Sequence, residues 1–192
     1  MLALRPALVS DIPELVRILE ASARGLCRSE YTCEQVEAAL GDAWGVDRQL
    51  IEDGTYFVVV SDGQTVACGG WSRRATAFGG DQGALRDPRL LDPAMDAARI
   101  RAFFVRPEWA RRGIGRLLLQ HCEREALAAG FGAAELVATL GGHPFYRRCG
   151  YRGDSRVRYV LRNGTGIDFV PMQKRLAAAA DDSDRVEVRD RG

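Results

Sequence analysis

Lysine is nearly absent from this chain of 192 residues: Lys174 is the one lysine, and arginine supplies the remaining positive side chains. Positive and negative side chains nearly balance, which leaves a formal net charge of +1 at pH 7. Proteins that bind nucleic acid or an acidic membrane surface usually carry a strong basic excess. The charge balance therefore predicts neither a nucleic acid nor a membrane as a partner.

The spacing of ligands that a structural metal site needs is missing as well. The chain has two histidines and five cysteines, and no two cysteines form a C-x-x-C pair. Structural zinc sites are usually built from such closely spaced pairs. We expect no metal cofactor. The odd number of scattered cysteines is typical of a protein from a reducing compartment.

Long apolar runs are also lacking. No run approaches the roughly 20 residues that a membrane-spanning helix needs, and residues 1–6 lack the apolar core of a signal peptide. We therefore expect a soluble, cytoplasmic protein. A hydrophobic content of 46% is enough for one well-packed domain, but the oligomeric state stays open, a homodimer included.

Helical and strand patterns alternate along residues 1–176. Capping-box patterns at Asp11–Glu14 and Thr32–Gln35 predict the starts of two helices, and the Asp-Gly and Asn-Gly pairs at 62–63 and 163–164 predict hairpin turns. The predicted elements run in the order strand 2–5, helix 12–22, a helix after 32, strands 56–60, 65–71 and 100–105, helix 115–129, strand 135–140, helix 144–149, and strands 157–161 and 167–170. This order favours an α/β (α+β) domain of mixed sheet and helices.

Two segments fall outside this pattern. Residues 73–98 contain Gly79-Gly80, Pro88 and Pro93 and show no sustained period, which predicts an insertion or a mobile loop. Residues 177–192 begin with four alanines, continue into an acidic run and hold few apolar groups. We predict a disordered acidic tail there.

The turn between strand 100–105 and the following helix has the chemistry of an anion cradle. A helix N-terminus presents N–H groups without partners and a partial positive charge, and the glycines at 113 and 115 let a ligand approach the backbone closely. Arg111, Arg112 and Arg116 add cationic side chains. A basic loop before a helix would look the same, so the pattern alone does not identify a ligand.

Three motifs in order make the chain resemble the GNAT superfamily of acyl-CoA-dependent N-acyltransferases. The sequence Arg-Arg-Gly-Ile-Gly at 111–115 is similar to the family's pyrophosphate loop, and Phe-Tyr-Arg-Arg-Cys-Gly-Tyr at 145–151 is similar to its F-Y-x-x-x-G-F/Y element. Residues 170–176 resemble its last strand. The resemblance implies a mixed central sheet whose fourth and fifth strands splay apart, flanked by helices.

The resemblance also implies a cosubstrate and its binding residues. Acetyl-CoA would lie along the fourth strand, with its amide-bearing arm held by the backbone of Phe103, Phe104 and Val105. Its pyrophosphate would rest on the residues of the loop and helix start: Arg111, Arg112, Gly113, Ile114, Gly115 and Arg116. One departure is Ala110, where the family usually has Gln or Arg.

Tyr146 matches the position of a family tyrosine that protonates the departing thiolate. The general base stays open, with four candidates: Glu30, Asp96, Glu108 and His143. Acceptor contacts are expected from Tyr31, Trp71 and Arg73, and a solvated strand end is the alternative for Arg73. No residue of the chain identifies the acceptor.

Three functional hypotheses follow. The first is an acetyl-CoA-dependent N-acetyltransferase that acts on a primary amine of a small molecule or peptide by direct attack in a ternary complex. The second is a non-catalytic acyl-CoA-binding sensor or regulatory module, because strand 100–105 carries no carboxylate to act as a base. The third, an arginine-rich nucleic-acid binder, is disfavoured by the charge balance.

Overall fold

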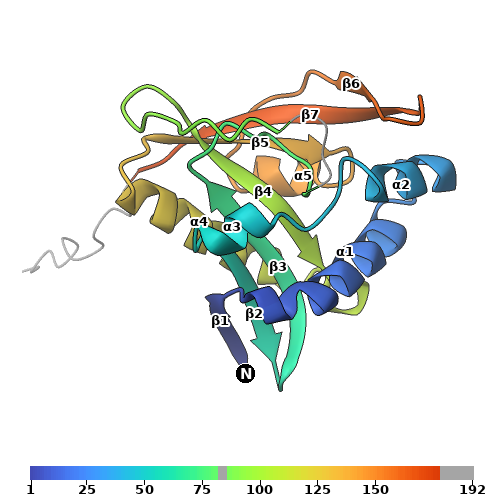
Figure 1. Cartoon of the computed structure of the whole chain (residues 1–192), viewed down its shortest axis with the longest axis horizontal. Helices are drawn as coiled ribbons and strands as arrows, with labels where there is room; N and C mark the ends of the chain where they lie inside the picture. Colours follow the sequence, from blue (N-terminus) through green and yellow to red (C-terminus); the bar gives the residue numbers. More distant parts are fainter. Residues whose placement is uncertain (82–85, 178–192) are drawn as a thin grey trace, which may run out of the picture.

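One seven-stranded mixed sheet organises the chain (Figure 1). The structure is a computed structural model that describes residues 1–81 and 86–177. The sheet order is β1-β2-β3-β4-β5-β7-β6. The strands are β1 (Leu2–Pro6), β2 (Tyr56–Ser61), β3 (Gln64–Ser72), β4 (Ala98–Val105), β5 (Ala133–Thr139), β6 (Val157–Val160) and β7 (Gly166–Arg175). Neighbouring strands are antiparallel except for β4 and β5, which are parallel.

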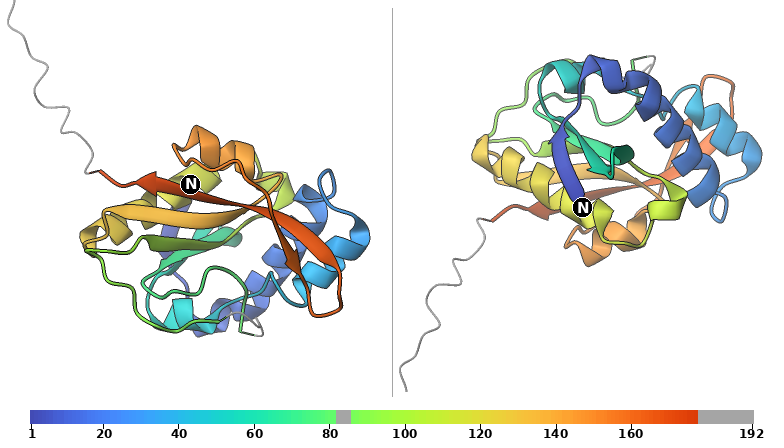
Figure 2. Two further views of the ribbon diagram at one scale, coloured as in Figure 1. Left: turned by 90° about the horizontal axis from the view of Figure 1, so that it is seen from above. Right: turned by 90° about the horizontal axis from the view of Figure 1, so that it is seen from below.

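Helices cover both faces of the sheet (Figure 2). On one face lie α1 (Ile12–Leu26), α2 (Cys33–Leu40) and α3 (Arg48–Glu52), and on the other α4 (Ile114–Ala128) and α5 (His143–Arg148). The apolar stripe of α4 buries Leu118 and Cys122 completely against the sheet. Burial on both faces explains why the central strands read as continuous apolar runs.

The parallel pair β4 and β5 separates soon after it forms. Only two residue pairs connect these strands, Ala98 with Ala134 and Arg99 with Glu135. Both strands continue beyond this point, β4 to Val105 and β5 to Thr139. The sheet therefore opens into a V at its centre, and the facing edges of β4 and β5 are not paired with each other.

A bulge bends β4 at the mouth of this V. The register of β3 against β4 shifts between Cys68 and Gly70, so Gly69 has no single partner on β4. Ala102, at the bulge, has a φ of 55°, in the left-handed region that residues other than glycine rarely adopt. The bulge turns the backbone of β4 just before Phe103 and Phe104.

The structure confirms the predicted fold class and most of its elements. The hairpin turns at 62–63 and 163–164 both contain a glycine with positive φ. The Thr32 capping box is present, with the threonine hydroxyl accepting from the Gln35 amide and the Gln35 side chain accepting from the Thr32 amide. Helix α4 ends just before Gly130, which has a φ of 94°.

The capping box predicted at Asp11–Glu14 is wrong. The Asp11 carboxylate makes no cap to α1 and instead accepts hydrogen bonds from Arg5 and from the Leu8 amide. Glu14 pairs with Arg17 and Arg106. A short 3-10 turn at Val9–Asp11 precedes the helix, so the chain enters α1 from a turn that the capping pattern did not reveal.

Segment 73–98 is partly tied to the domain by polar contacts. Arg74 forms a bidentate ion pair with Asp53 and an isolated bridge with Leu90. Thr76 and Asp87 exchange hydrogen bonds. The described parts of this segment are therefore anchored at both ends, whereas the predicted tail, apart from Ala177, lies outside the described residues.

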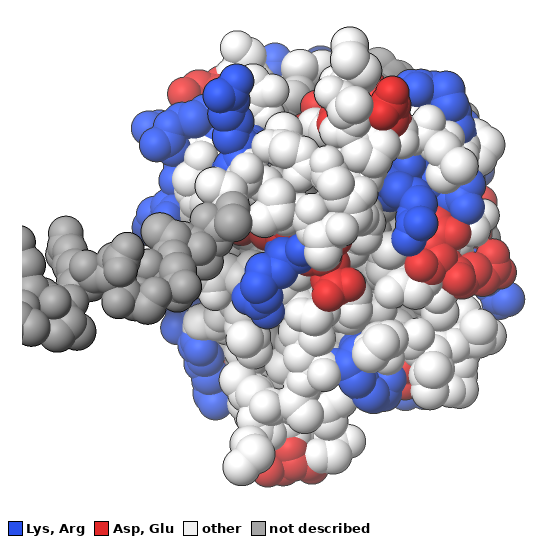
Figure 3. All heavy atoms as spheres, turned by 90° about the vertical axis from the view of Figure 1, so that its left-hand side faces the viewer, with Lys and Arg blue, Asp and Glu red and all other residues white. Residues whose placement is uncertain are grey.

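Charges of both signs are interspersed on the surface. On the face drawn in Figure 3, described arginine and lysine side chains alternate with aspartate and glutamate rather than gathering in one patch of a single sign. In the described part of the chain, no helix is both long and apolar enough to cross a bilayer.

Candidate functional site

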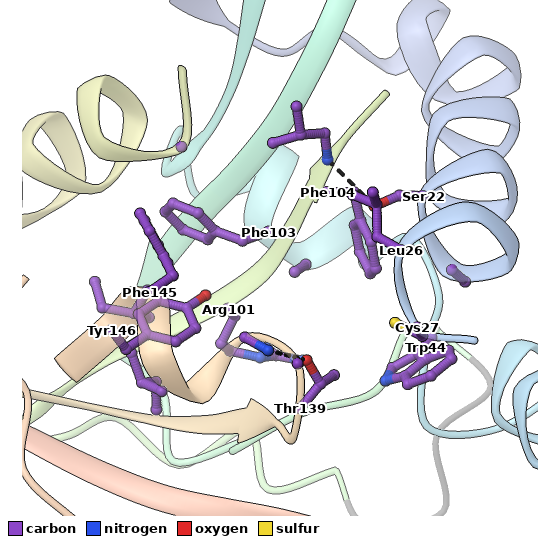
Figure 4. A pocket seen from close by; sticks show the side chains of 18 of the residues that line it. Ser22, Leu26, Cys27, Trp44, Arg101, Phe103, Phe104, Thr139, Phe145 and Tyr146 are labelled. Carbon is purple, nitrogen blue, oxygen red and sulfur yellow. Dashed lines mark hydrogen bonds between the residues drawn. The ribbon is translucent and has the colours of Figure 1, made fainter. Parts of the chain in front are cut away.

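A cavity of about 630 Å³ occupies the V between β4 and β5. Its walls come from β4, β5, β7, the start of α4, α5, the end of α1 and the segments that follow α2 and β3. Figure 4 shows Phe103, Phe145 and Tyr146 on one side of the cavity and Phe104, Leu26 and Trp44 on the other. We call these the α5 side and the α1 side. The strand β4 runs between them.

The start of α4 faces the cavity with free backbone amides. Gly113 is the N-cap, with a φ of 82°, and no side chain caps the helix. The preceding Arg111 also has a positive φ of 63°. The first intrahelical bond of α4 runs from the Leu117 amide to the Gly113 carbonyl, so the amides before Leu117 remain available for an anion.

Cationic side chains surround this helix start. Arg111 and Arg116 line the cavity, together with Gly113, Ile114 and Gly115. Arg112 does not line it, because its guanidinium stacks on the ring of Trp109 at 4.8 Å. Arg148, at the end of α5, lines the cavity instead. This end of the cavity therefore combines amides and guanidinium groups and fits a phosphate-bearing ligand.

The rings of Phe103 and Phe145 on the α5 side are closely packed against glycines. A Cβ on Gly69 would lie 2.7 Å from the ring of Phe103, and a Cβ on Gly115 would lie 3.4 Å from the ring of Phe145. Small residues at these positions let the two rings sit deep. Phe103, Phe104 and Val105 all line the cavity, and Ser22 accepts a hydrogen bond of 3.4 Å from the Val105 amide.

Tyr146 projects from α5 into the cavity (Figure 4). Its ring packs edge to face on Phe145, at 4.9 Å, and against Tyr151. Burial raises the pKa of the Tyr146 phenol well above its ordinary value. The hydroxyl therefore stays protonated at neutral pH and can donate a proton or a hydrogen bond.

Arg101 forms a buried ion pair on the α1 side. Its Nη1 lies 2.8 Å from Oδ2 of Asp47, and its Nη2 donates to the Gly79 carbonyl at 2.7 Å. Arg86 donates to the other oxygen of Asp47 at 3.1 Å. Burial lowers the pKa of Arg101, although Asp47 opposes that shift. Two guanidinium groups therefore share one carboxylate beneath the cavity.

No aspartate, glutamate or histidine is among the described residues that line the cavity. The four candidate bases lie elsewhere. His143 Nε2 lies 2.9 Å from the Gly153 carbonyl, Asp96 accepts from the Asp92 amide, and Glu108 is exposed beside Arg106. Glu30 is exposed on the loop after α1. The arrangement offers no side-chain base within the cavity walls that the structure describes.

The three expected acceptor contacts lie outside the cavity wall. The Tyr31 hydroxyl is fully used, donating to the Asp168 carbonyl at 2.6 Å and accepting from the Leu140 amide. Trp71 is buried in the core against Phe131, and Arg73 is exposed with its guanidinium 5.8 Å from the Trp71 ring. Because these groups serve packing or face solvent, we do not retain them in the site.

Other lining residues carry no local signal in the sequence. Trp44 and Phe78 lie in connecting segments with no periodic pattern, and long-range packing brings them to the cavity. The sequence could have indicated Arg148 as a lining residue, because on a helix it lies one turn after Phe145 and shares its face. Among the described residues, no group of three or more His, Cys, Asp or Glu side chains could hold a metal ion.

Residues 52–153 match the family model described as an acetyltransferase (GNAT) domain. The matched region runs from the end of α3 past the cradle and through the Tyr146 element. It contains both walls of the V. No curated protein sequence matches the chain.

Solved structures share the fold. A GCN5-related N-acetyltransferase from Rhodopseudomonas palustris is 24% identical, with a TM-score of 0.67 over 91% of this chain and 95% of that one. A PaiA N-acetyltransferase from Thermoplasma acidophilum, solved with coenzyme A, is 14% identical, with a TM-score of 0.61 over 91% and 99%. The ribosomal-protein-S18-alanine N-acetyltransferase from Escherichia coli is 15% identical, with a TM-score of 0.58 over 95% and 98%.

Proposed function

Because the chain belongs to the GNAT family of acetyltransferases, we propose that residues 1–176 form one domain that transfers an acetyl group from acetyl-CoA to a primary amine. One observation carries this proposal. The unpaired edge of β4 and the uncapped, arginine-flanked start of α4 meet in the same cavity as Tyr146. An extended, amide-bearing arm that ends in a pyrophosphate matches this arrangement.

The binding of acetyl-CoA uses mainly the backbone. The pantetheine arm lies along Phe103, Phe104 and Val105 as an added strand, and the pyrophosphate rests on the amides from Gly113 to Arg116. Arg111, Arg116 and Arg148 supply positive charge at that end. Arg112 contributes through its stacking on Trp109 rather than by direct contact. Because the contacts are mostly backbone, Ala110 is compatible with binding.

The transfer proceeds by direct attack within a ternary complex. The nitrogen lone pair of the amine forms a bond to the acetyl carbonyl carbon, and the carbon–sulfur bond breaks. The negative charge that develops on the carbonyl oxygen is stabilised by a backbone N–H of β4. Tyr146 donates its proton to the departing thiolate and regains one from solvent, so the net products are an amide and free coenzyme A.

The amine must reach the cavity in its neutral form. No carboxylate or imidazole belongs to the described lining, which supports proton loss to water rather than to a side-chain base. Only a small fraction of an alkylamine with a pKa of about 10 is neutral at pH 7. We therefore propose that the neutral fraction binds, and that the attacking nitrogen releases its proton through ordered water.

The lack of a side-chain base in the described cavity lining also favours a second candidate, a non-catalytic acyl-CoA sensor. Both candidates predict coenzyme A binding, and only the enzyme predicts thiol release that depends on an amine. Purified protein should be incubated with acetyl-CoA and a panel of amines, while free thiol is measured. Coenzyme A binding without amine-dependent thiol release would support the sensor and refute the enzyme. Absence of binding would refute both candidates.

Replacement of Tyr146 tests the proposed acid. Tyr146→Phe should lower kcat by about 10- to 100-fold and leave the Kd of coenzyme A nearly unchanged. Tyr151→Phe is the matched control, because it removes a buried phenolic hydroxyl from a neighbouring ring that does not line the cavity. Equal kcat values for the two variants would remove Tyr146 from the mechanism.

A further inference from the structure

Four aromatic rings form a wall on the α1 side of the cavity. We call this set the aromatic wall, and it consists of Trp44, Phe78, Phe104 and Phe169. Its members come from four separate segments of the chain, and Phe78 and Phe104 pack against the buried cluster that contains Trp44 and Phe169. The Phe169 ring lies 6.4 Å from Trp44 and 5.9 Å from Phe78. Such a wall offers a large apolar contact area at a small cost in side-chain entropy.

Rings outside the cavity brace the aromatic wall. Tyr31 packs edge to face on Trp44 at 6.0 Å, and Tyr159 packs edge to face on Phe78 at 4.8 Å. The Tyr31 hydroxyl is itself fixed by two hydrogen bonds. The wall is therefore preorganised, and a ligand that packs on it does not have to order it.

The charge around the aromatic wall is positive. Arg101 is the one cationic residue among the described lining on this side, and its side chain is 97% buried. Its Nε has no partner among the described residues. Asp47 is shared between Arg101 and Arg86, and Asp81 is shared between Arg86 and Arg48. Three guanidinium groups therefore face two carboxylates, and the cluster retains a net positive charge. A cationic group bound here would meet repulsion and would find no carboxylate in the described lining.

We infer that the acceptor is a primary amine carried on an aromatic or aliphatic apolar body, without a second positive charge. This inference rests on the proposed function. The apolar body packs on the aromatic wall, and the amino group points across β4 toward Tyr146. The positive cluster around Arg101 disfavours the ammonium form and favours the neutral nucleophile that the reaction needs.

A panel of amines tests the acceptor class with acetyl-CoA saturating and pH constant. The probes are 2-phenylethylamine, n-pentylamine and 1,5-diaminopentane, of which the last two differ by one terminal ammonium. We expect kcat/KM for both monoamines to exceed that for the diamine by at least about tenfold. A diamine that is used as well as n-pentylamine would overturn the inference.

A carboxylate placed in the cavity should reverse this preference. Leu26 lines the cavity at the end of α1 and is 40% exposed, so Leu26→Glu is compatible with folding. The variant should raise the diamine-to-pentylamine ratio of kcat/KM by about tenfold. Val16→Glu is the matched control, because Val16 is also 40% exposed on α1 and does not line the cavity. Its ratio should equal that of the unmodified protein.

The Kd of coenzyme A separates the two possible failures. If coenzyme A binds and amines are acetylated, but Leu26→Glu leaves the ratio unchanged, the acceptor class is refuted and the proposed function stands. If no amine in a broad panel releases thiol, both are refuted. Coenzyme A binding should be equal in Leu26→Glu, Val16→Glu and the unmodified protein, which verifies that each variant is folded.

Discussion

The hydroxyl of Tyr56 donates a hydrogen bond of 2.9 Å to the carbonyl oxygen of Ala102. This bond joins a fully buried tyrosine of β2 to the one residue of β4 that has a left-handed backbone conformation. It crosses beneath β3, which lies between the two strands in the sheet. The bulge that turns Phe103 and Phe104 into the cavity is therefore supported from the core.

Tyr56→Phe should weaken both the fold and the reaction. Removing the hydroxyl leaves the Ala102 carbonyl without its partner, which should lower the free energy of unfolding by about 1–3 kcal/mol. The altered bulge should lower kcat more than it weakens coenzyme A binding, since the cradle at α4 is untouched. Urea denaturation and steady-state kinetics measure the two effects. A loss of stability with unchanged kcat would show that the bulge does not orient the acyl group.

Gly113→Ala should impair binding through backbone strain. Gly113 has a φ of 82°, and a Cβ there would meet no atom within 4 Å, so strain and not collision is the cost. Gly63→Ala is a matched control, with a φ of 80° and equally free space in a distant hairpin. Both variants should lose about 1 kcal/mol of stability. Only Gly113→Ala should raise the Kd of coenzyme A, measured by calorimetry. Equal Kd values would argue against the cradle.

Asp47→Asn should be strongly destabilising. The change leaves Arg101 buried without its carboxylate and should cost about 3–5 kcal/mol. Asp47→Leu combined with Arg101→Leu removes the buried pair and should recover part of that loss, because a buried ion pair adds little over apolar packing. The recovery is partial because the Asp47 cap of α3 is lost, while Arg86 keeps Asp81 as a partner. Thermal and urea unfolding of the single and double variants provide the comparison. A single variant within about 1 kcal/mol of the unmodified protein would contradict the buried-pair description.

The pH dependence should follow the acceptor rather than the enzyme. Because the neutral amine attacks, kcat/KM should rise tenfold per pH unit until the pKa of the amine is reached. Tyr146 must be protonated to act as the acid, and its raised pKa keeps it protonated as pH increases through its ordinary value of about 10. An amine of lower pKa should reach its plateau at lower pH. If the plots of kcat/KM against pH changed slope at the same pH for all amines, a side-chain base would be titrating instead.

Local patterns were sufficient to predict most of the fold. Alternation, glycine turns and the Thr32 capping box depend on residues close together in the chain, so they can be recognised without tertiary contacts. Helix α3 was missed because it has only five residues and too little periodicity to predict. The predicted capping box at Asp11 is absent for a different reason, because the Asp11 carboxylate pairs with Arg5 across a turn.

The two sides of the cavity differ in how far the sequence could predict them. The α4 cradle and the Tyr146 element are contiguous motifs, and the structure brings both to the V between β4 and β5. The aromatic wall assembles from four distant segments, and only tertiary packing reveals it. Tyr31 lies in the loop from which acceptor contacts were expected, but its hydroxyl points inward and bonds to the Asp168 carbonyl and the Leu140 amide. This role depends on tertiary contacts and could not be read from the loop sequence.

The short pairing between β4 and β5 has a consequence for the lifetime of the protein. Two residue pairs join β4 and β5 on either side of the V. A bound acyl donor that contacts both strand edges would therefore stabilise the part of the sheet with the fewest strand-to-strand pairs. A ligand at a hundredfold excess over its Kd adds about 2.7 kcal/mol to the stability of the folded state. Proteases that cleave transiently opened chains would then degrade this protein fastest when its acyl donor is scarce.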